Sequence, residues 1–518
     1  MKMKKLYIAL VAMSATAFTS CDMDVEQEGV ITIENALQTK TDCDKFMNNI
    51  YGNLRTVTAG AYISKPELQM DKFVGTVENG NRNMLFSSAS LTAGDGDVNS
   101  IFAGMYTAIN NCNYFIPGAQ AIIDKGDLTS DAAASISYNI GEAKFARAFY
   151  YTYLMDHYCD SYTAANANKP ASGMPIVTVY SPSADRSTYP GRSTLQQLVD
   201  FINKDLEEAY DAIKDYEDNV SMEYVVPCAT HVNSYTVEAL QARVALLTGD
   251  YATAIAKAED VIGSTKFALS EGDDYLAMWT TDEATECLFV PFGDNSERGS
   301  VPATGSAWLT NDDENTSDYI PTPEAFTAYG SDDVRKSAFF AEYTFEFQGN
   351  SAMGLAFNKF PGNSIFNQGN ENPLRNKPKP FRTSELYLIV AEAAAADGPQ
   401  KNESKANDYL NELRAARIQN YQEMTYSGAT LINEIRAERT KELIGEGFRM
   451  SDLRRWGLGF NRQANYTSLG LSATLNSFIQ PNSNNVSYTP GYYMYVWPIP
   501  QAELDVNPQL RGQQNPGY

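Results

Sequence analysis

The chain has 518 residues, of which 43% are hydrophobic and 12% aromatic, so it carries enough apolar material for a folded core and is not a disordered segment. Forty lysines and arginines stand against 64 aspartates and glutamates, a formal net charge of −24. This balance repels phosphate backbones and argues against nucleic acid or an anionic membrane surface as a partner. Two histidines are too few for a metal site built from several histidines.

The first 20 residues resemble the signal peptide of a bacterial lipoprotein. Three lysines precede an apolar run from Leu6 to Phe18, which at 13 residues is too short to span a bilayer. Because the small residues Thr19 and Ser20 directly precede Cys21, this cysteine resembles a lipid-acylation site. We therefore predict cleavage before Cys21, an acidic tether over residues 21–30 and a single folded domain over residues 31–518.

Helical periodicity dominates the folded part of the chain. Apolar side chains recur every three to four positions in several segments, and a Thr-Gly-Asp turn joins two of these segments into an alanine-rich hairpin that resembles a tetratricopeptide unit. The predicted helices span residues 135–158, 194–213, 236–250, 251–262, 385–396 and 406–418, the last two as a second hairpin. The pattern predicts a mostly α protein, with a tetratricopeptide-like helical-hairpin scaffold and long irregular loop excursions.

Four long segments lack this periodicity and are rich in Gly, Asn, Ser, Thr and Pro. They span residues 58–97, 159–192, 283–317 and 459–490. Loops of this length in a compact protein are usually functional or disordered, and we expect ordered excursions from the scaffold. Residues 95–99 begin like a calcium-binding loop but lack its glycine and its final glutamate, so they are predicted to form the first turn of a helix that begins near Ser100.

The five cysteines after Cys21 are widely spaced and contain no C-x-x-C pair. We predict that they are small buried hydrophobic residues with at most one disulfide bridge. The sequence contains no phosphate-binding loop, dinucleotide fingerprint, nucleophile elbow or zinc-binding helix motif. No cofactor, metal ion or catalytic residue is therefore predicted.

The last 140 residues carry the most specific motifs in the chain. Residues 381–393 read FRTSELYLIVAEA, residues 435–443 read IRAERTKEL and residues 445–456 read GEGFRMSDLRRW. The chain then closes with WPIP at residues 497–500 and NPGY at residues 515–518. In this order, and behind a lipoprotein signal, these motifs resemble those of the RagB/SusD family of Bacteroidetes nutrient-uptake outer-membrane lipoproteins.

The resemblance implies a surface-exposed protein of the cell outer membrane that is attached through its N-terminal lipid only. It would capture oligosaccharides and deliver them to a SusC-like TonB-dependent transporter, without catalysing a reaction. Three alternatives remain open at this point. The protein could capture peptides in the same way, it could be a surface glycoside hydrolase with two carboxylates about 5 to 10 Å apart, or it could be a purely structural partner of the transporter.

Residues 436–455 are densely charged, and on one helix Arg436, Arg439 and Glu442 fall three positions apart. We interpret this run as a network of ion pairs that fixes the C-terminal segment onto the helices, and not as a catalytic site. The proline-rich residues 498–518 are predicted to be a strap that docks on the scaffold.

Protein sites that bind sugars combine a flat aromatic ring with planar polar groups on rigid loops. Trp308 is the candidate stacking platform because it lies in an irregular loop, shortly before Tyr319; the equally weighted alternative is that it packs the loop against the scaffold. Arg82 and Asn83 are candidate partners for sugar hydroxyls, but a solvated turn is the favoured interpretation of their loop. The other tryptophans are predicted to be structural, and they are Trp279, Trp456 and Trp497.

Overall fold

The structure is a computed structural model that describes residues 36–309, 316–347, 349–369, 371–471 and 473–518. The predicted signal peptide, Cys21 and the acidic tether lie outside the described residues. The structure therefore bears on the predicted domain from residue 36 onward, apart from the gaps just given.

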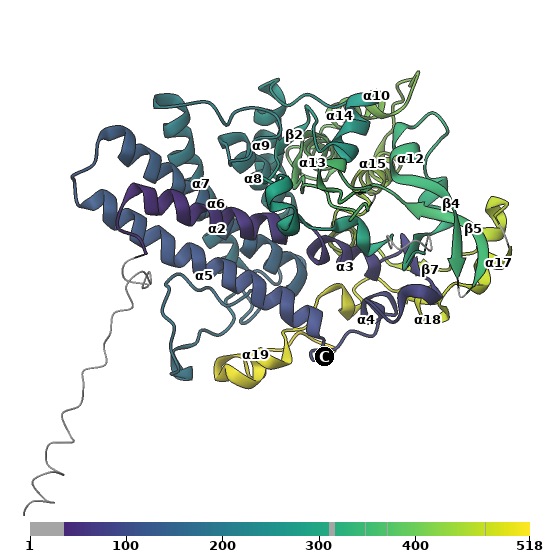
Figure 1. The fold of residues 1–518 in the computed structure, drawn as a ribbon, viewed down its shortest axis with the longest axis horizontal. Helices are drawn as coiled ribbons and strands as arrows, with labels where there is room; N and C mark the ends of the chain where they lie inside the picture. The colour runs from purple at the N-terminus through teal and green to yellow at the C-terminus, as the bar shows by residue number, and fades with distance from the viewer. Residues whose placement is uncertain (1–35, 310–315, 348, 370, 472) are drawn as a thin grey trace, which may run out of the picture.

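Long helices packed side by side form the left and centre of the molecule in Figure 1. They are α2 (Lys40–Val57), α5 (Gly96–Asp124), α6 (Ser130–Tyr158), α7 (Leu195–Asn219), α8 (Ser234–Thr248) and α9 (Tyr251–Gly263). Helices α2 and α5 pack on α6, α6 packs on α7, and α7 packs on α8. Gly249 ends α8 in the left-handed conformation, and Asp250 caps α9 by accepting from the Thr253 amide. This tight turn confirms the predicted hairpin.

A second hairpin continues the scaffold toward the C-terminus. It consists of α13 (Thr383–Ala395) and α14 (Glu403–Arg417), and α13 also packs on α9 and on α15 (Gly428–Leu443). Ala391, Ala393 and Ala394 of α13 are fully buried, and such small side chains let neighbouring helices approach closely. The predicted mostly helical scaffold is confirmed.

Short strands and helices order the segments between these hairpins. The strands pair antiparallel, two by two: β1 (Phe73–Gly75) with β3 (Tyr319–Pro321), β2 (Cys287–Phe289) with β6 (Phe381–Arg382), β4 (Phe340–Phe347) with β5 (Asn350–Phe357), and β7 (Phe460–Arg462) with β8 (Val486–Tyr488). The short helices are α3 (Ala61–Gln69), α4 (Met84–Ser87), α10 (Gly272–Thr280), α11 (Pro323–Thr327), α12 (Val334–Phe339), α16 (Arg449–Arg455), α17 (Ala473–Ser477), α18 (Pro481–Asn484) and α19 (Gln501–Val506). In the parts that the structure describes, the expected loop excursions are thus ordered, but they contain more regular structure than their composition predicted.

The N-terminal turn expected before Ser100 is present. Asp95 caps α5, and its side chain accepts from the amides of Asp97 and Val98. Helix α5 itself therefore begins at Gly96. The acidic residues at this position serve as a helix cap, as the sequence predicted.

The C-terminal segment docks on the end of α6. The Asn515 amide donates to the main-chain oxygens of Tyr158 and Trp497, at 2.9 and 2.7 Å. The Arg192 guanidinium donates to the Asn515 side-chain oxygen at 2.7 Å. These contacts confirm the predicted strap.

The cysteines that the structure describes are unbridged. Cys43, Cys112, Cys159 and Cys287 are buried, and Cys228 is half-buried. Burial raises the pKa of the Cys112 thiol to about 12, so this group is inert at neutral pH. The prediction of small buried hydrophobic residues is confirmed for four of the five.

Candidate functional site

The structure brings the predicted ligand residues together at the sheet formed by β1 and β3. Tyr319 lies in β3, and its hydroxyl donates to the main-chain oxygen of Arg82, which is 237 positions earlier in the chain. The Trp308 ring contacts the ring of Phe73 in β1, with centroids 5.3 Å apart. Arg82 and Asn83 therefore share one region with Trp308 and Tyr319.

Trp308 is part of the core and does not form a stacking platform. The residue is 0% exposed, and its ring packs against those of Phe73, Phe357 and Phe360 at centroid distances of 5.3, 5.0 and 5.8 Å. Since aromatic neighbours surround the indole, a sugar ring cannot stack on it in this arrangement. The platform prediction for Trp308 is wrong. The alternative, in which Trp308 packs the loop against the core, is what the structure has.

Tyr319 is fully buried as well. Its hydroxyl already donates to Arg82, and it lies 3.4 Å from the Ser87 hydroxyl. The predicted ligand contact through the Tyr319 ring is therefore wrong. Tyr319 supports the Arg82 loop through the hydrogen bond of its hydroxyl to the Arg82 main chain.

Arg82 is the exposed member of the group. Its Nε and Nη2 donate to the two carboxylate oxygens of Asp318, both at 2.6 Å. The Arg82 side chain is 59% exposed, whereas that of Asp318 is only 5% exposed. A bidentate pair of this kind fixes the plane of the guanidinium at the protein surface.

Asn83 is held in a similar way. The Lys65 ammonium donates to the Asn83 side-chain oxygen and, at 2.6 Å, to Asp97. The supporting residues Lys65, Asp97 and Asp318 were missed by the sequence analysis. No local pattern marks them, because their role arises from contacts between distant parts of the chain.

The backbone of the Arg82 loop is also fixed. Gly80, Asn81 and Asn83 adopt left-handed conformations, with φ of 54°, 65° and 56°. Asparagine tolerates this region better than most residues, and the Asn79 side chain accepts from the Asn81 amide at 2.9 Å. Such a backbone persists only where its surroundings hold it, a situation typical of ligand-binding loops.

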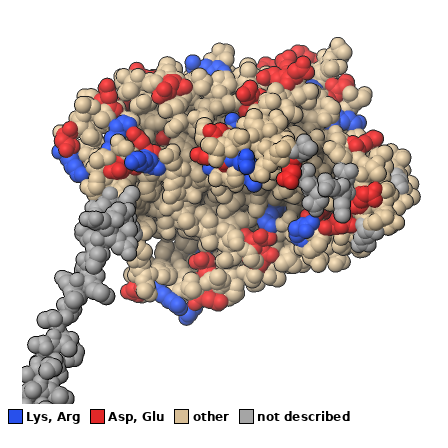
Figure 2. All heavy atoms as spheres, in the orientation of Figure 1, with Lys and Arg blue, Asp and Glu red and all other residues tan. Residues whose placement is uncertain are grey.

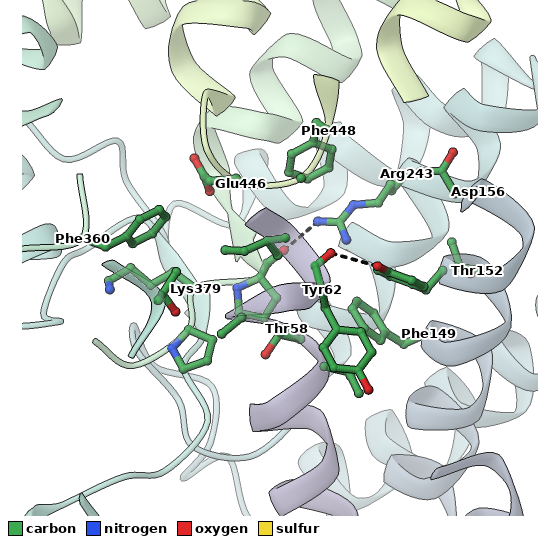
Figure 3. Close-up of a pocket in the computed structure, with 18 of the residues that line it drawn as sticks. Thr58, Tyr62, Phe149, Thr152, Asp156, Arg243, Phe360, Lys379, Glu446 and Phe448 are labelled. Carbon is green, nitrogen blue, oxygen red and sulfur yellow. Dashed lines mark hydrogen bonds between the residues drawn. The ribbon is translucent and has the colours of Figure 1, made fainter. Parts of the chain in front are cut away.

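A partly open cavity of about 110 Å³ lies where the helices meet the loop segments (Figure 3). Tyr62 of α3, Phe149 of α6 and Arg243 of α8 line it. The Arg243 guanidinium donates to the Pro380 main-chain oxygen at 2.6 Å, drawn as a dashed line in Figure 3, and to both oxygens of Glu385. Small-molecule sites usually measure about 300–1,000 Å³. The cavity is therefore smaller than usual small-molecule sites and has no room for an oligosaccharide.

The charged run before Trp456 forms a buried ion-pair network. Glu442 of α15 pairs with Arg335 at 3.1 Å, with Arg382 at 2.9 Å and with Arg417 at 3.0 Å, and all four side chains are at most 1% exposed. Although burial raises the pKa of Glu442, the three guanidinium groups outweigh this effect and hold it well below its usual value. The predicted ion-pair network is confirmed.

Glu67 of α3 is a buried carboxylate in a different environment. Its Oε1 accepts from the amides of Gly447 and Arg449, at 2.9 and 3.3 Å, while Oε2 has no hydrogen-bond partner in the described part of the chain. Burial raises the pKa of Glu67 to about 7. The folded protein therefore holds this proton more tightly than the unfolded chain does.

This raised pKa predicts a pH dependence that Glu67→Gln removes. The stabilisation from proton binding is fully present below the unfolded pKa of about 4.3 and is lost as the pH rises through about 7. The free energy of unfolding of the variant, relative to the unmodified protein, should therefore rise by up to about 3 kcal/mol between pH 4.5 and pH 8. Urea titrations at several pH values measure this difference. Parallel pH profiles of the two proteins would contradict the assignment.

On the face shown in Figure 2, charged side chains are scattered over a largely uncharged surface, and acidic ones gather at its upper right edge. The described residues on this face form no extended basic area of the kind that nucleic-acid-binding proteins carry. Within the described ranges, no helix is both long enough and apolar enough to cross a bilayer, and no three His, Cys, Asp or Glu side chains gather as metal ligands.

Two family models match the chain. One, described as the SusD family, matches residues 342–518, and the other, described as starch-binding associating with outer membrane, matches residues 31–246. Together they cover about three quarters of the sequence. The chain belongs to the RagB/SusD family, as its motifs indicated.

Solved structures of this superfamily share the fold. A SusD superfamily protein from Bacteroides thetaiotaomicron superposes with a TM-score of 0.73 at 23% identity, over 92% of this chain and 100% of that one. A protein from Bacteroides vulgatus described as a putative sugar binding protein gives 0.73 at 24% identity, over 93% and 99%. A laminarin binding SusD-like protein gives 0.65 at 19% identity, over 93% and 100%. A search of the curated proteins gives no match.

Proposed function

We propose that this protein is a cell-surface glycan-binding lipoprotein that captures oligosaccharides and delivers them to a SusC-like TonB-dependent transporter. Membership of the RagB/SusD family and the starch-binding description of its N-terminal match support a carbohydrate ligand. The structural similarity to a laminarin binding SusD-like protein also supports a carbohydrate ligand. In this proposal the protein captures its ligand without chemical change.

The observation that carries the proposal is the exposed Arg82 guanidinium, which the buried Asp318 carboxylate holds in one orientation. Sugar hydroxyls are recognised by planar polar groups held in one orientation, since a group that is already immobile loses little entropy on binding. Arg82 meets this requirement because Asp318 fixes its guanidinium plane and Tyr319 binds its main chain. We assign the glycan contact to the loop that carries Arg82 and Asn83.

The membrane attachment belongs to the same proposal. Cleavage of residues 1–20 would expose Cys21 for acylation, and residues 21–30 would form an acidic tether to a single domain over residues 31–518. The lipid alone would hold the protein on the outer membrane. A solvated acidic tether would leave the Arg82 loop accessible from outside the cell.

Exchanging Arg82 for lysine tests the site. Lysine keeps the positive charge beside Asp318 but loses the planar fork, so we expect glycan affinity to fall about tenfold, which corresponds to one or two hydrogen bonds. The melting temperature should change little, because lysine keeps a positive charge beside the buried Asp318 carboxylate. Arg186→Lys, at another exposed arginine, is the matched control. Unchanged affinity of the Arg82 variant would remove the loop from the site.

The ligand class is decided by native affinity gels run with the lipid-free chain, residues 22–518, on a panel of polysaccharides. Retardation by a glycan without release of reducing sugar is the expected result. A response only to a casein digest would favour peptide capture, and release of reducing sugar would favour a glycoside hydrolase. Retardation by neither glycan nor peptide would favour a purely structural partner of the transporter.

A further inference from the structure

Trp456 differs from the other three tryptophans of the chain. Trp279, Trp308 and Trp497 are at most 2% exposed, whereas Trp456 is half-buried and borders an open hollow of about 570 Å³. Helices α11, α15 and α16 contribute to the walls of this hollow. This volume lies within the usual range of small-molecule sites, whereas the cavity of about 110 Å³ lined by Tyr62 and Arg243 is below it.

The lining of the hollow is basic, although the chain as a whole carries a charge of −24. Two acidic side chains line it, Glu324 and Glu434, against five basic ones. The basic side chains are Lys72, Arg414, Arg436, Lys441 and Arg449. An anion would therefore meet an uncompensated positive charge only at a basic side chain that no carboxylate neutralises.

Arg436 is the basic group that the protein leaves unpaired. The other four basic side chains each form an ion pair with a carboxylate, at 2.7 to 3.0 Å. For Arg436 no carboxylate of the described chain lies within ion-pair distance, and its Nε is buried without a hydrogen-bond partner there. Because no ion pair neutralises it, the Arg436 guanidinium is the charge in this hollow with which an anion can pair.

The position of Arg436 is fixed by Trp456. The guanidinium carbon lies 5.2 Å from the centre of the indole ring, within the range of a cation–π contact. The indole Nε1 donates to Glu392 at 2.7 Å, which fixes the ring in turn. Burial lowers the pKa of Arg436, but an arginine remains charged at neutral pH. The hollow therefore presents a positioned guanidinium.

We propose that this hollow binds an acidic saccharide, with Arg436 pairing with the sugar carboxylate. The inference rests on the proposed function and names a substrate class for a second site, distinct from the Arg82 loop. Planar guanidinium and carboxylate groups match in a bidentate pair, and the exposed Asn433 amide on the same wall suits a sugar hydroxyl. Glu324 and Glu434 on the lining favour a singly charged carboxylate over a doubly charged phosphate.

Calorimetry with paired probes tests the proposal. The lipid-free chain is titrated with trigalacturonate, a hyaluronan tetrasaccharide and sialyllactose, and with the carboxyl-reduced, neutral form of each. We expect at least one acidic probe to bind at least tenfold more tightly than its neutral form, with a preference that weakens as salt is added. Arg436→Gln should abolish this preference, while Arg511→Gln, at an exposed arginine in the C-terminal segment, should keep it.

Two results would overturn the inference while leaving glycan capture in place. In the first, a neutral glycan binds but no acidic probe binds with higher affinity than its neutral form. In the second, Arg436→Gln keeps the full preference for the acidic probe. Arg436→Lys, which preserves the charge without the fork, serves as the second variant if the glutamine variant melts early, and we expect a partial loss of the preference. A failure to bind any glycan, acidic or neutral, would overturn both the inference and the proposed function.

Discussion

Glu442→Ala is expected to lower the free energy of unfolding by about 3–5 kcal/mol, because it leaves three buried guanidinium groups without their shared carboxylate. Removing one partner of a buried pair costs more than the pair contributes, since the remaining charge can neither leave the interior nor find water. Chemical denaturation at pH 7 measures the loss. Asp408→Ala, at an exposed acid on α14, is the control and should stay within about 0.5 kcal/mol of the unmodified protein.

The same variant should show a defined pH dependence. The pKa of Glu442 is depressed in the folded protein, so its contribution is present above the unfolded pKa of about 4.3 and is lost only as the pH falls toward the folded value. The difference between Glu442→Ala and the unmodified protein should therefore be constant from pH 5 to pH 8 and shrink in stronger acid. A difference that grows in acid would contradict this account of the network.

Trp308→Ala is expected to destabilise the protein by about 3–5 kcal/mol, the usual cost of removing a large aromatic side chain from a core. Glycan affinity, measured well below the melting temperature, should change little, because the indole contacts Phe73, Phe357 and Phe360 and is not exposed. Trp308→Phe keeps most of the buried area and should cost less. Loss of affinity with an unchanged melting temperature would instead restore the stacking platform.

Helices α7 and α9 could be predicted because their buried residues recur every three to four positions and so form one face. Helix α3 could not, since Ser64 to Gln69 are all buried, the polar Lys65 and Glu67 included, and Pro66 lies within the helix. A helix that is buried on every side loses the apolar periodicity that identifies it. Its polar side chains are accommodated by distant partners, such as the Gly447 amide for Glu67.

The candidate site could be predicted only in part. The composition of the loop pointed to Arg82 and Asn83, but the Asp318 carboxylate that orients Arg82 comes from 236 positions away. The stacking platform was predicted at Trp308 because Gly- and Ser-rich loops usually have too few large side chains to bury a tryptophan. Here several such segments pack together into an aromatic core of their own, and long-range packing of this kind leaves no trace in local composition.

The ion-pair network around Glu442 also bears on how this fold can diversify. Its charges join α12, α14, α15 and β6, so a substitution there disturbs several elements at once. The ion pairs of Glu442 do not involve the Arg82 loop, whose contacts include those with Asp318, Lys65 and Tyr319. Residues of the Arg82 loop can therefore be exchanged without breaking the ion pairs of Glu442, so changes in the loop and stability of the interior are separable.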